Sequence, residues 1–194
     1  MALLALFCVV VGGILVATGT RQSGAPQTNG SPAPAHRTAE SPPAPTASTP
    51  ARLRIPAVGV DAAIETVGLT SQHDMEVPRD PRNVGWYRGG PVPGQPGSAV
   101  IDGHLNWTQG PAVFWNLDKL RAGDQIQVTN TSGHAVSFRV AESASYPIYE
   151  PPPPDLFSFG GPSRLSLITC AGDWTDTGYS RRLVVGAPLA TDRG

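Results

Sequence analysis

From residue 52 onward, the chain consists of short apolar or alternating runs separated by Gly, Pro and Asp. This pattern is typical of an all-β domain. We expect strands at residues 52–55, 62–67, 99–103, 125–130, 135–141, 164–169 and 183–187. So many short strands favour a closed barrel or a sandwich, and no helical pattern is long enough for an α/β fold.

Two local signals add detail to this all-β pattern. Residues 113–119 are the best helical candidate, because their apolar side chains share one face at helical spacing. Residues 131–133, with the sequence TSG, predict a short hairpin connection in which Gly133 takes a positive φ. We therefore expect one or two short helices and at least one tight hairpin.

The N-terminal residues 1–20 contain no Asp, Glu, Lys or Arg. At about 1.5 Å rise per residue, a helix of this length just crosses a hydrocarbon core of about 30 Å. We interpret the segment as a single-pass anchor in the cell membrane, with the folded domain on the extracytoplasmic side. The alternative is a cleaved signal peptide, whose apolar region usually has about 7 to 15 residues. Positive charge should precede either segment, whereas Arg21 follows it.

Residues 21–51 are rich in Ala, Pro, Ser and Thr and have almost nothing to bury. Such a composition does not offset the entropy of ordering, and its prolines favour the extended polyproline II geometry. We expect a disordered, semi-rigid tether. The predicted organisation is thus an anchor at 1–20, a linker at 21–51 and one folded domain at 52–194.

The charge balance excludes one class of partner. The chain has 14 basic and 15 acidic residues and a net charge of -1. No positive excess is available to neutralise a phosphate backbone, so we expect no nucleic-acid binding.

Cys170 is the only cysteine outside the N-terminal apolar segment, and Cys8 lies inside that segment. No intrachain disulfide is therefore expected. A leftover cysteine in an exported domain indicates intermolecular pairing or a reactive thiol, although a free cysteine can also fill an apolar core. The polar, glycine-containing residues 171–178 predict a loop, which places Cys170 at a strand end that a substrate can reach.

A reactive thiol needs a cationic neighbour that stabilises the thiolate. The candidate cations are His104, Arg181 and Arg182. Successive side chains on a strand point to opposite faces, so only one of the two arginines can face Cys170.

Three segments together resemble the sortase family: GHLNW at 103–107, LITC at 167–170 and RLVV at 182–185. The resemblance runs from about residue 52 to the C-terminus, and the cysteine motif is its specific part. Ser166 stands where the family motif has threonine. The resemblance implies a closed eight-stranded β-barrel and a membrane-anchored cysteine transpeptidase. The proline-rich tether, the Gly-His-Xaa-Xaa-Trp element and the lack of a large C-terminal extension look most similar to the actinobacterial class F enzymes, with class E next.

By this resemblance, Cys170 is the nucleophile, His104 the general acid and base, and Arg182 the group that steadies the developing oxyanion. The chemistry calls for these residue types, since a thiol needs activation, a leaving amine needs a proton and an oxyanion needs a donor. Arg182 is preferred to Arg181 because the family places its arginine directly before an apolar strand.

The resemblance also implies the substrates. The enzyme is expected to cleave secreted proteins at a C-terminal sorting signal of Leu-Pro-Xaa-Thr-Gly type, between Thr and Gly. A thioacyl intermediate would then be resolved by an amine of a peptidoglycan precursor. The proline-rich loop at 149–157 is expected to stiffen one wall of the peptide groove, and the alternative is a rigid surface crossover that does not contact the substrate. Glu150 and Asp155 offer too few ligands for calcium, so we expect neither a metal nor a cofactor.

Two alternatives remain open. An L,D-transpeptidase also uses a Cys-His pair, but the sequence around Cys170 lacks the Ser-His-Gly-Cys motif of that family. A catalytically silent wall-binding domain would keep the barrel and bury the thiol, which would then resist a charged alkylating reagent in the folded state.

Overall fold

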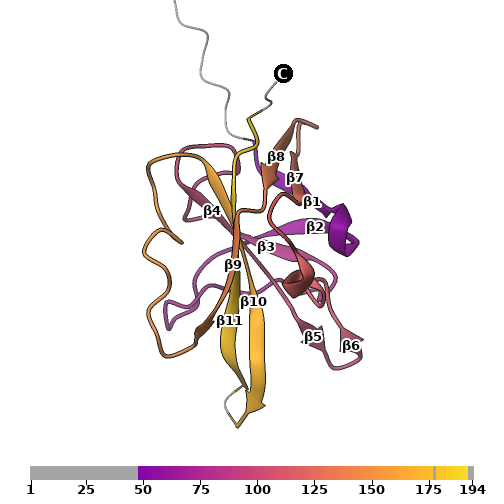
Figure 1. Cartoon of the computed structure of the whole chain (residues 1–194), viewed down its shortest axis with the longest axis vertical. Coiled ribbons are helices and arrows are strands. Elements are labelled where there is room, and N and C mark those ends of the chain that lie inside the picture. The colour runs from indigo at the N-terminus through magenta and orange to yellow at the C-terminus, as the bar shows by residue number, and fades with distance from the viewer. Residues whose placement is uncertain (1–47, 177, 192–194) are drawn as a thin grey trace, which may run out of the picture. The chain divides into compact units, whose positions relative to one another are not determined.

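The computed structural model describes residues 48–176 and 178–191 (Figure 1). The predicted anchor at 1–20 lies outside the described residues, as does nearly all of the linker at 21–51. Within the described part of the chain, no helix has the length and apolar character needed to cross a membrane.

One nine-stranded sheet forms most of the fold, in the order β8-β7-β1-β2-β3-β4-β10-β11-β9. The strands are β1 (Pro50–Ile55), β2 (Val60–Val67), β3 (Val84–Tyr87), β4 (Ser98–Gly103), β7 (Gln125–Asn130), β8 (Ala135–Arg139), β9 (Glu142–Pro147), β10 (Arg164–Thr175) and β11 (Gly178–Pro188). The β2–β3 and β4–β10 pairs are parallel, and the other pairs are antiparallel. Strands β5 (Asn106–Trp107) and β6 (Gly110–Pro111) form a separate small hairpin.

All the strands expected from the sequence are present, so the all-β prediction is confirmed. Four strands were not expected: β3, which is only four residues long, the two-residue strands β5 and β6, and β9, whose polar sequence ESASYP shows no apolar alternation. The helix expected at 113–119 was largely wrong, because only Leu117–Lys119 form a 3-10 turn, η2. The other 3-10 turn among the described residues is η1 (Pro56–Val58). The 131–133 turn joins β7 to β8, and Gly133 has a φ of 84° as expected.

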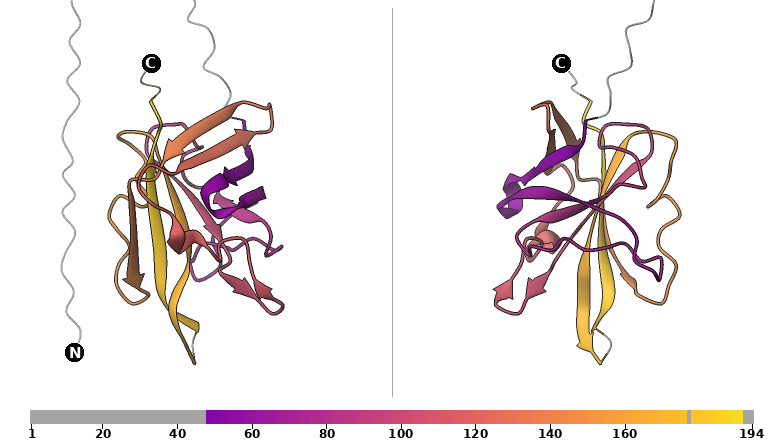
Figure 2. Two further views of the ribbon diagram at one scale, coloured as in Figure 1. Left: turned by 45° about the vertical axis from the view of Figure 1, so that its right-hand side comes forward. Right: turned by 180° about the vertical axis from the view of Figure 1, so that it is seen from behind.

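A closed eight-stranded barrel was expected. The structure instead has a curled sheet of nine strands, and the hydrogen-bonded ladder does not run around to form a closed barrel (Figure 2). Its two edge strands, β8 and β9, do not pair with each other. Instead, β8 meets the residues after β11 through a single bridge between Phe138 and Leu189. The Ala190 amide donates to the Ser137 carbonyl oxygen at 2.8 Å beside this bridge.

Apolar side chains of the sheet and of the segment between β6 and β7 make one core. Its largest fully buried members are Phe114, Phe138, Leu53, Ile55, Ile101, Leu117, Ile126, Leu165 and Leu167. Because β4 and β10 lie side by side and both contribute to this core, the C-terminal end of β4 is fixed beside the middle of β10.

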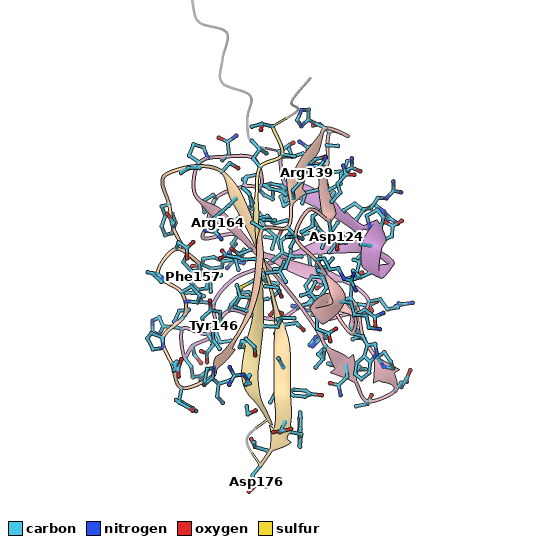
Figure 3. The ribbon with its side chains drawn as sticks, in the orientation of Figure 1. Asp124, Arg139, Tyr146, Phe157, Arg164 and Asp176 are labelled. Atoms are coloured by element: carbon cyan, nitrogen blue, oxygen red, sulfur yellow. The ribbon has the colours of Figure 1, made fainter. Side chains whose placement is uncertain are left out.

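The strand that carries Cys170 is longer than expected. The predicted loop at 171–178 is wrong, because β10 continues to Thr175 and β11 begins at Gly178. A bulge between Ala171 and Trp174 gives β10 one extra residue relative to β11. Gly172 enables the bulge with a φ of 76°, and a Cβ there would lie 2.6 Å from the Ser180 hydroxyl. Cys170 thus lies inside a strand, and Asp176 marks the tip of the β10–β11 hairpin (Figure 3).

Candidate active site

Cys170, His104 and Arg182 line one groove of about 450 Å³, which we call the main groove. Cys170 lies on β10 and is paired with Arg182 on β11, whereas His104 directly follows β4. The other lining residues are Asp74, Met75, Val77, Asp102, Gly103, Tyr146, Pro147, Ile148, Glu150, Pro152, Pro153, Leu156, Phe157, Ile168 and Val184. The three side chains singled out from the sequence are therefore neighbours in one concave site.

His104 is held by contacts on two sides. Its Nε2 lies 2.9 Å from the Pro78 carbonyl oxygen, which can only accept, so Nε2 carries the proton. The ring also packs on Trp107 with centroids 4.9 Å apart and a tilt of 58°. The preceding Gly103 is required by close packing, because a Cβ would lie 2.5 Å from Phe114. This arrangement fixes the imidazole and leaves Nδ1 as the basic atom of the neutral ring.

The two neighbouring arginines have different surroundings. Arg181 donates from Nε to the Ser145 hydroxyl at 2.9 Å and from Nη2 to the Ser145 carbonyl oxygen at 2.5 Å, and it is absent from the groove lining. Arg182 lines the groove, and its Nη1 donates to the Arg181 carbonyl oxygen at 3.1 Å. The geometry therefore leaves Arg182 as the guanidinium available to a ligand of the main groove.

The pKa of the Cys170 thiol is raised above its usual value. Burial is the largest cause, the Arg182 guanidinium opposes it, and the Asp102 carboxylate adds to it. The expected stabilisation of the thiolate by a cation is present, but burial outweighs it. The resting thiol is consequently protonated at neutral pH and needs a base to activate it.

Asp102 is a groove residue that the sequence analysis missed. It lies on β4 opposite Ile168 and lines the main groove, and burial raises the pKa of its carboxyl to about 7 against the opposing effect of Arg182. The available signal was a charged residue inside the otherwise apolar run at 98–103. A carboxyl of this kind changes charge near neutral pH, beside Cys170.

We expect Asp102→Asn to flatten the pH dependence of stability. The folded carboxyl has a raised pKa, so the folded state binds its proton more tightly than the unfolded chain does, and stability falls as the pH rises from about 4 to about 7. The native protein should lose about 3 kcal/mol of unfolding free energy through this group between about pH 5 and about pH 8, at roughly 1.36 kcal/mol per pKa unit. Urea unfolding of both proteins at the two pH values measures this difference, and equal pH slopes would contradict it.

Buried hydroxyls connect β10 to β4 near the site. Thr169 is 1% exposed, and its Oγ1 donates to the Gly103 carbonyl oxygen at 2.7 Å, next to His104. Ser166, which stands where the family motif has threonine, lies 2.9 Å from the Ser98 hydroxyl in a buried pair. The serine thus keeps a hydroxyl at this position, and its partner satisfies it.

We expect Thr169→Val to destabilise the fold by about 1 to 3 kcal/mol, because it leaves the buried Gly103 carbonyl oxygen without its donor. Thr169→Ser keeps the hydroxyl and serves as the matched control, with a smaller loss from the missing methyl group. Denaturant unfolding measures both variants. A serine variant as unstable as the valine variant would show that the hydrogen bond is not the cause.

The proline-rich loop forms one wall of the main groove, where the sequence placed it. Pro152, Pro153, Leu156 and Phe157 are among its lining residues. Figure 3 shows Phe157 on the same flank of the domain as Tyr146 of β9. Phe157 also packs edge-on against Tyr87 at 6.1 Å between ring centroids, which ties the loop to β3. Among the described residues, no three His, Cys, Asp or Glu side chains are grouped to hold a metal ion.

Comparisons with known proteins agree with this arrangement. The model of the sortase domain family matches residues 53–190. Sortase C-1 from Actinomyces oris is 25% identical, with a TM-score of 0.57 over 73% of this chain and 73% of that one. The complex of Streptococcus agalactiae sortase C1 and MTSET is 22% identical, with a TM-score of 0.58 over 74% and 70% of the two chains. Sortase A from Corynebacterium diphtheriae is 21% identical, with a TM-score of 0.59 over 74% and 61%. No curated protein sequence matches the chain.

Proposed function

This chain belongs to the sortase family of cysteine transpeptidases, which attach proteins to the cell wall, and we propose that Cys170, His104 and Arg182 perform its reaction. The observation that carries the proposal is that these three side chains line one groove. The donor is a secreted protein with a C-terminal sorting signal of Leu-Pro-Xaa-Thr-Gly type, cleaved between Thr and Gly. The acceptor is an amine of a peptidoglycan precursor.

The first half of the reaction forms a thioester. The Cys170 sulfur attacks the threonine carbonyl carbon, and the amide bond to glycine breaks. Because the pKa of the thiol is raised, its proton must be taken up during the attack, and the free Nδ1 of His104 is the proposed acceptor. His104 then passes this proton to the departing glycine amine. The Arg182 guanidinium stabilises the negative charge on the carbonyl oxygen.

The second half releases the product. An incoming amine attacks the thioester carbon, the carbon–sulfur bond breaks, and a new amide forms. His104 takes a proton from the amine, and the Cys170 sulfur recovers a proton as it leaves. With water as the acceptor, the same site hydrolyses the signal, so the cleavage is of the hydrolase type.

The wall of the main groove fits an extended peptide. Four consecutive prolines at 151–154 restrict the loop before any ligand binds, which reduces the entropy lost on binding. Apolar side chains such as Val77, Ile148 and Leu156 face the same groove. We propose that they contact the apolar part of the sorting signal.

Within the family, we assign the chain to class F, with class E as the alternative. The Gly-His-Xaa-Xaa-Trp element at 103–107 supports this assignment, since Trp107 packs on the ring of His104. The proline-rich segment at 21–51 supports it as well. We further propose that residues 1–20 anchor the protein in the cell membrane and that 52–194 form an extracytoplasmic catalytic domain.

The test uses the purified chain with a library of fluorogenic Leu-Pro-Xaa-Thr-Gly peptides and hydroxylamine as the acceptor. The proposal predicts a threonyl hydroxamate, and the library reports the preferred signal. The matched control is Cys170→Ala. No product from any peptide, together with a Cys170 that resists a charged alkylating reagent, would favour the silent wall-binding domain instead.

A further inference from the structure

A second cavity meets the main groove at its reactive end. This aromatic pocket, of about 580 Å³, is lined by His104, Leu105, Asn106, Trp107, Thr108, Cys170, Trp174 and Tyr179. It shares two residues with the main groove, and these are Cys170 and His104. The proposed nucleophile and the proposed base therefore face two separate cavities at once.

The two cavities are built from different parts of the fold. The main groove takes its wall from the proline-rich loop and β9, whereas the aromatic pocket is lined by residues 104–108, which include β5, and by the β10–β11 hairpin. In the views of Figures 1 and 2, the β10–β11 hairpin runs between the proline-rich loop and the β5–β6 hairpin. A ligand can thus approach Cys170 from either side of this hairpin.

The aromatic pocket has a distinct chemistry. Among the described residues, its lining contains no Asp, Glu, Lys or Arg, while the main groove contains Arg182 and three acidic residues. Trp107 is 45% exposed and Trp174 is 73% exposed. Trp174 also packs edge-on against Tyr179 at 5.1 Å, which holds its ring in place. Exposed indole faces in an otherwise uncharged site favour a ligand cation.

We propose that the aromatic pocket binds the amine partner of the reaction, a primary amine that enters as its ammonium form. The inference rests on the proposed function. The acyl chain and its carbonyl oxygen need Arg182, which lines only the main groove. The amine needs simultaneous access to the thioester carbon and to His104, and the aromatic pocket provides both while the acyl chain occupies the groove.

The protons and bonds of the amine attack can be followed through this arrangement. The ammonium form binds against the Trp107 and Trp174 faces and loses one proton to solvent. The amine then attacks the thioester carbon, gives its second proton to His104, and the carbon–sulfur bond breaks. Since the departing glycine amine of the first half reaction is the same chemical group, it leaves through the same pocket. Free glycine amide should therefore compete with the acceptor.

The experiment compares Trp174→Ala and Trp174→Phe in the full chain, with glycine amide and hydroxylamine as alternative acceptors. Loss of the indole should raise the KM for glycine amide by about tenfold, whereas the small and largely uncharged hydroxylamine should be affected much less. Trp174→Phe should restore most of the glycine amide affinity. Trp115→Ala is the matched control, because Trp115 is 48% exposed and lines a different cavity.

The outcomes separate this inference from the proposed function. Cleavage of the donor peptide with an unchanged glycine amide KM in Trp174→Ala would overturn the amine pocket and leave the transpeptidase intact. An equal loss with both acceptors would also overturn it, because it would point to a general defect of the hairpin. Absence of donor cleavage by the unsubstituted protein would instead overturn the proposed function.

Discussion

Replacing Cys170 with alanine should lower the rate of peptide exchange by at least about 1,000-fold, because the proposed reaction then loses its covalent intermediate. The fold should survive, since Cys170 is only partly buried and alanine fits the same space. Transpeptidation is measured as hydroxamate formation, and folding as the thermal midpoint by circular dichroism.

A control measurement for this prediction is the reactivity of the Cys170 thiol. In the unsubstituted protein, a charged alkylating reagent should modify Cys170 in the folded state, because the residue lines two open cavities. The modification should accelerate as the pH rises toward the raised pKa of the thiol. Appreciable exchange by the alanine variant would contradict the assignment of the nucleophile.

Replacing Arg182 with alanine should lower kcat by about 100- to 1,000-fold, the usual effect of losing one oxyanion donor. It should also raise the pKa of Cys170 further, because Arg182 is the group that lowers it. Arg182→Lys keeps the charge without the planar fork and should retain an intermediate activity. Steady-state kinetics with a saturating peptide and a saturating acceptor measures kcat for each variant.

Arg181→Ala is the matched control for Arg182. Its guanidinium is bonded to Ser145 on β9 and does not line the main groove. We expect its activity to stay within about threefold of the unsubstituted protein, as is usual for a residue outside the site. The opposite ranking of the two alanine variants would move the proposed role to Arg181.

The sequence was sufficient for the strands that alternate clearly, and it singled out three residues that the structure brings to one groove. It was insufficient for β9, which is paired to β11 although its own sequence is polar. It also misplaced the end of β10, because Gly172 and Asp173 look like a loop in the sequence. In the structure, Gly172 allows a bulge that keeps the ladder intact to Thr175. Strand pairing and bulges depend on residues that are far apart in the sequence, and a local sequence pattern does not contain this information.

The electrostatics of the site could not be predicted from the sequence either. The motif indicated cations beside Cys170, but the effect of burial on the thiol depends on how β4, β10 and β11 are arranged. Asp102 contributes only because the parallel β4–β10 register brings it beside Ile168. The aromatic pocket joins Trp107 to Trp174 across long sequence separation. Such sites follow from tertiary structure alone.

The central claim is that Cys170 carries the acyl group during the reaction. Its most direct test is the intact mass of the protein after rapid mixing with a Leu-Pro-Xaa-Thr-Gly peptide and acid quenching, followed by fragmentation. The account predicts an adduct with the mass of the peptide up to threonine, located on Cys170 and discharged by hydroxylamine. Signal cleavage without any adduct on Cys170, or with an adduct on another residue, would contradict it.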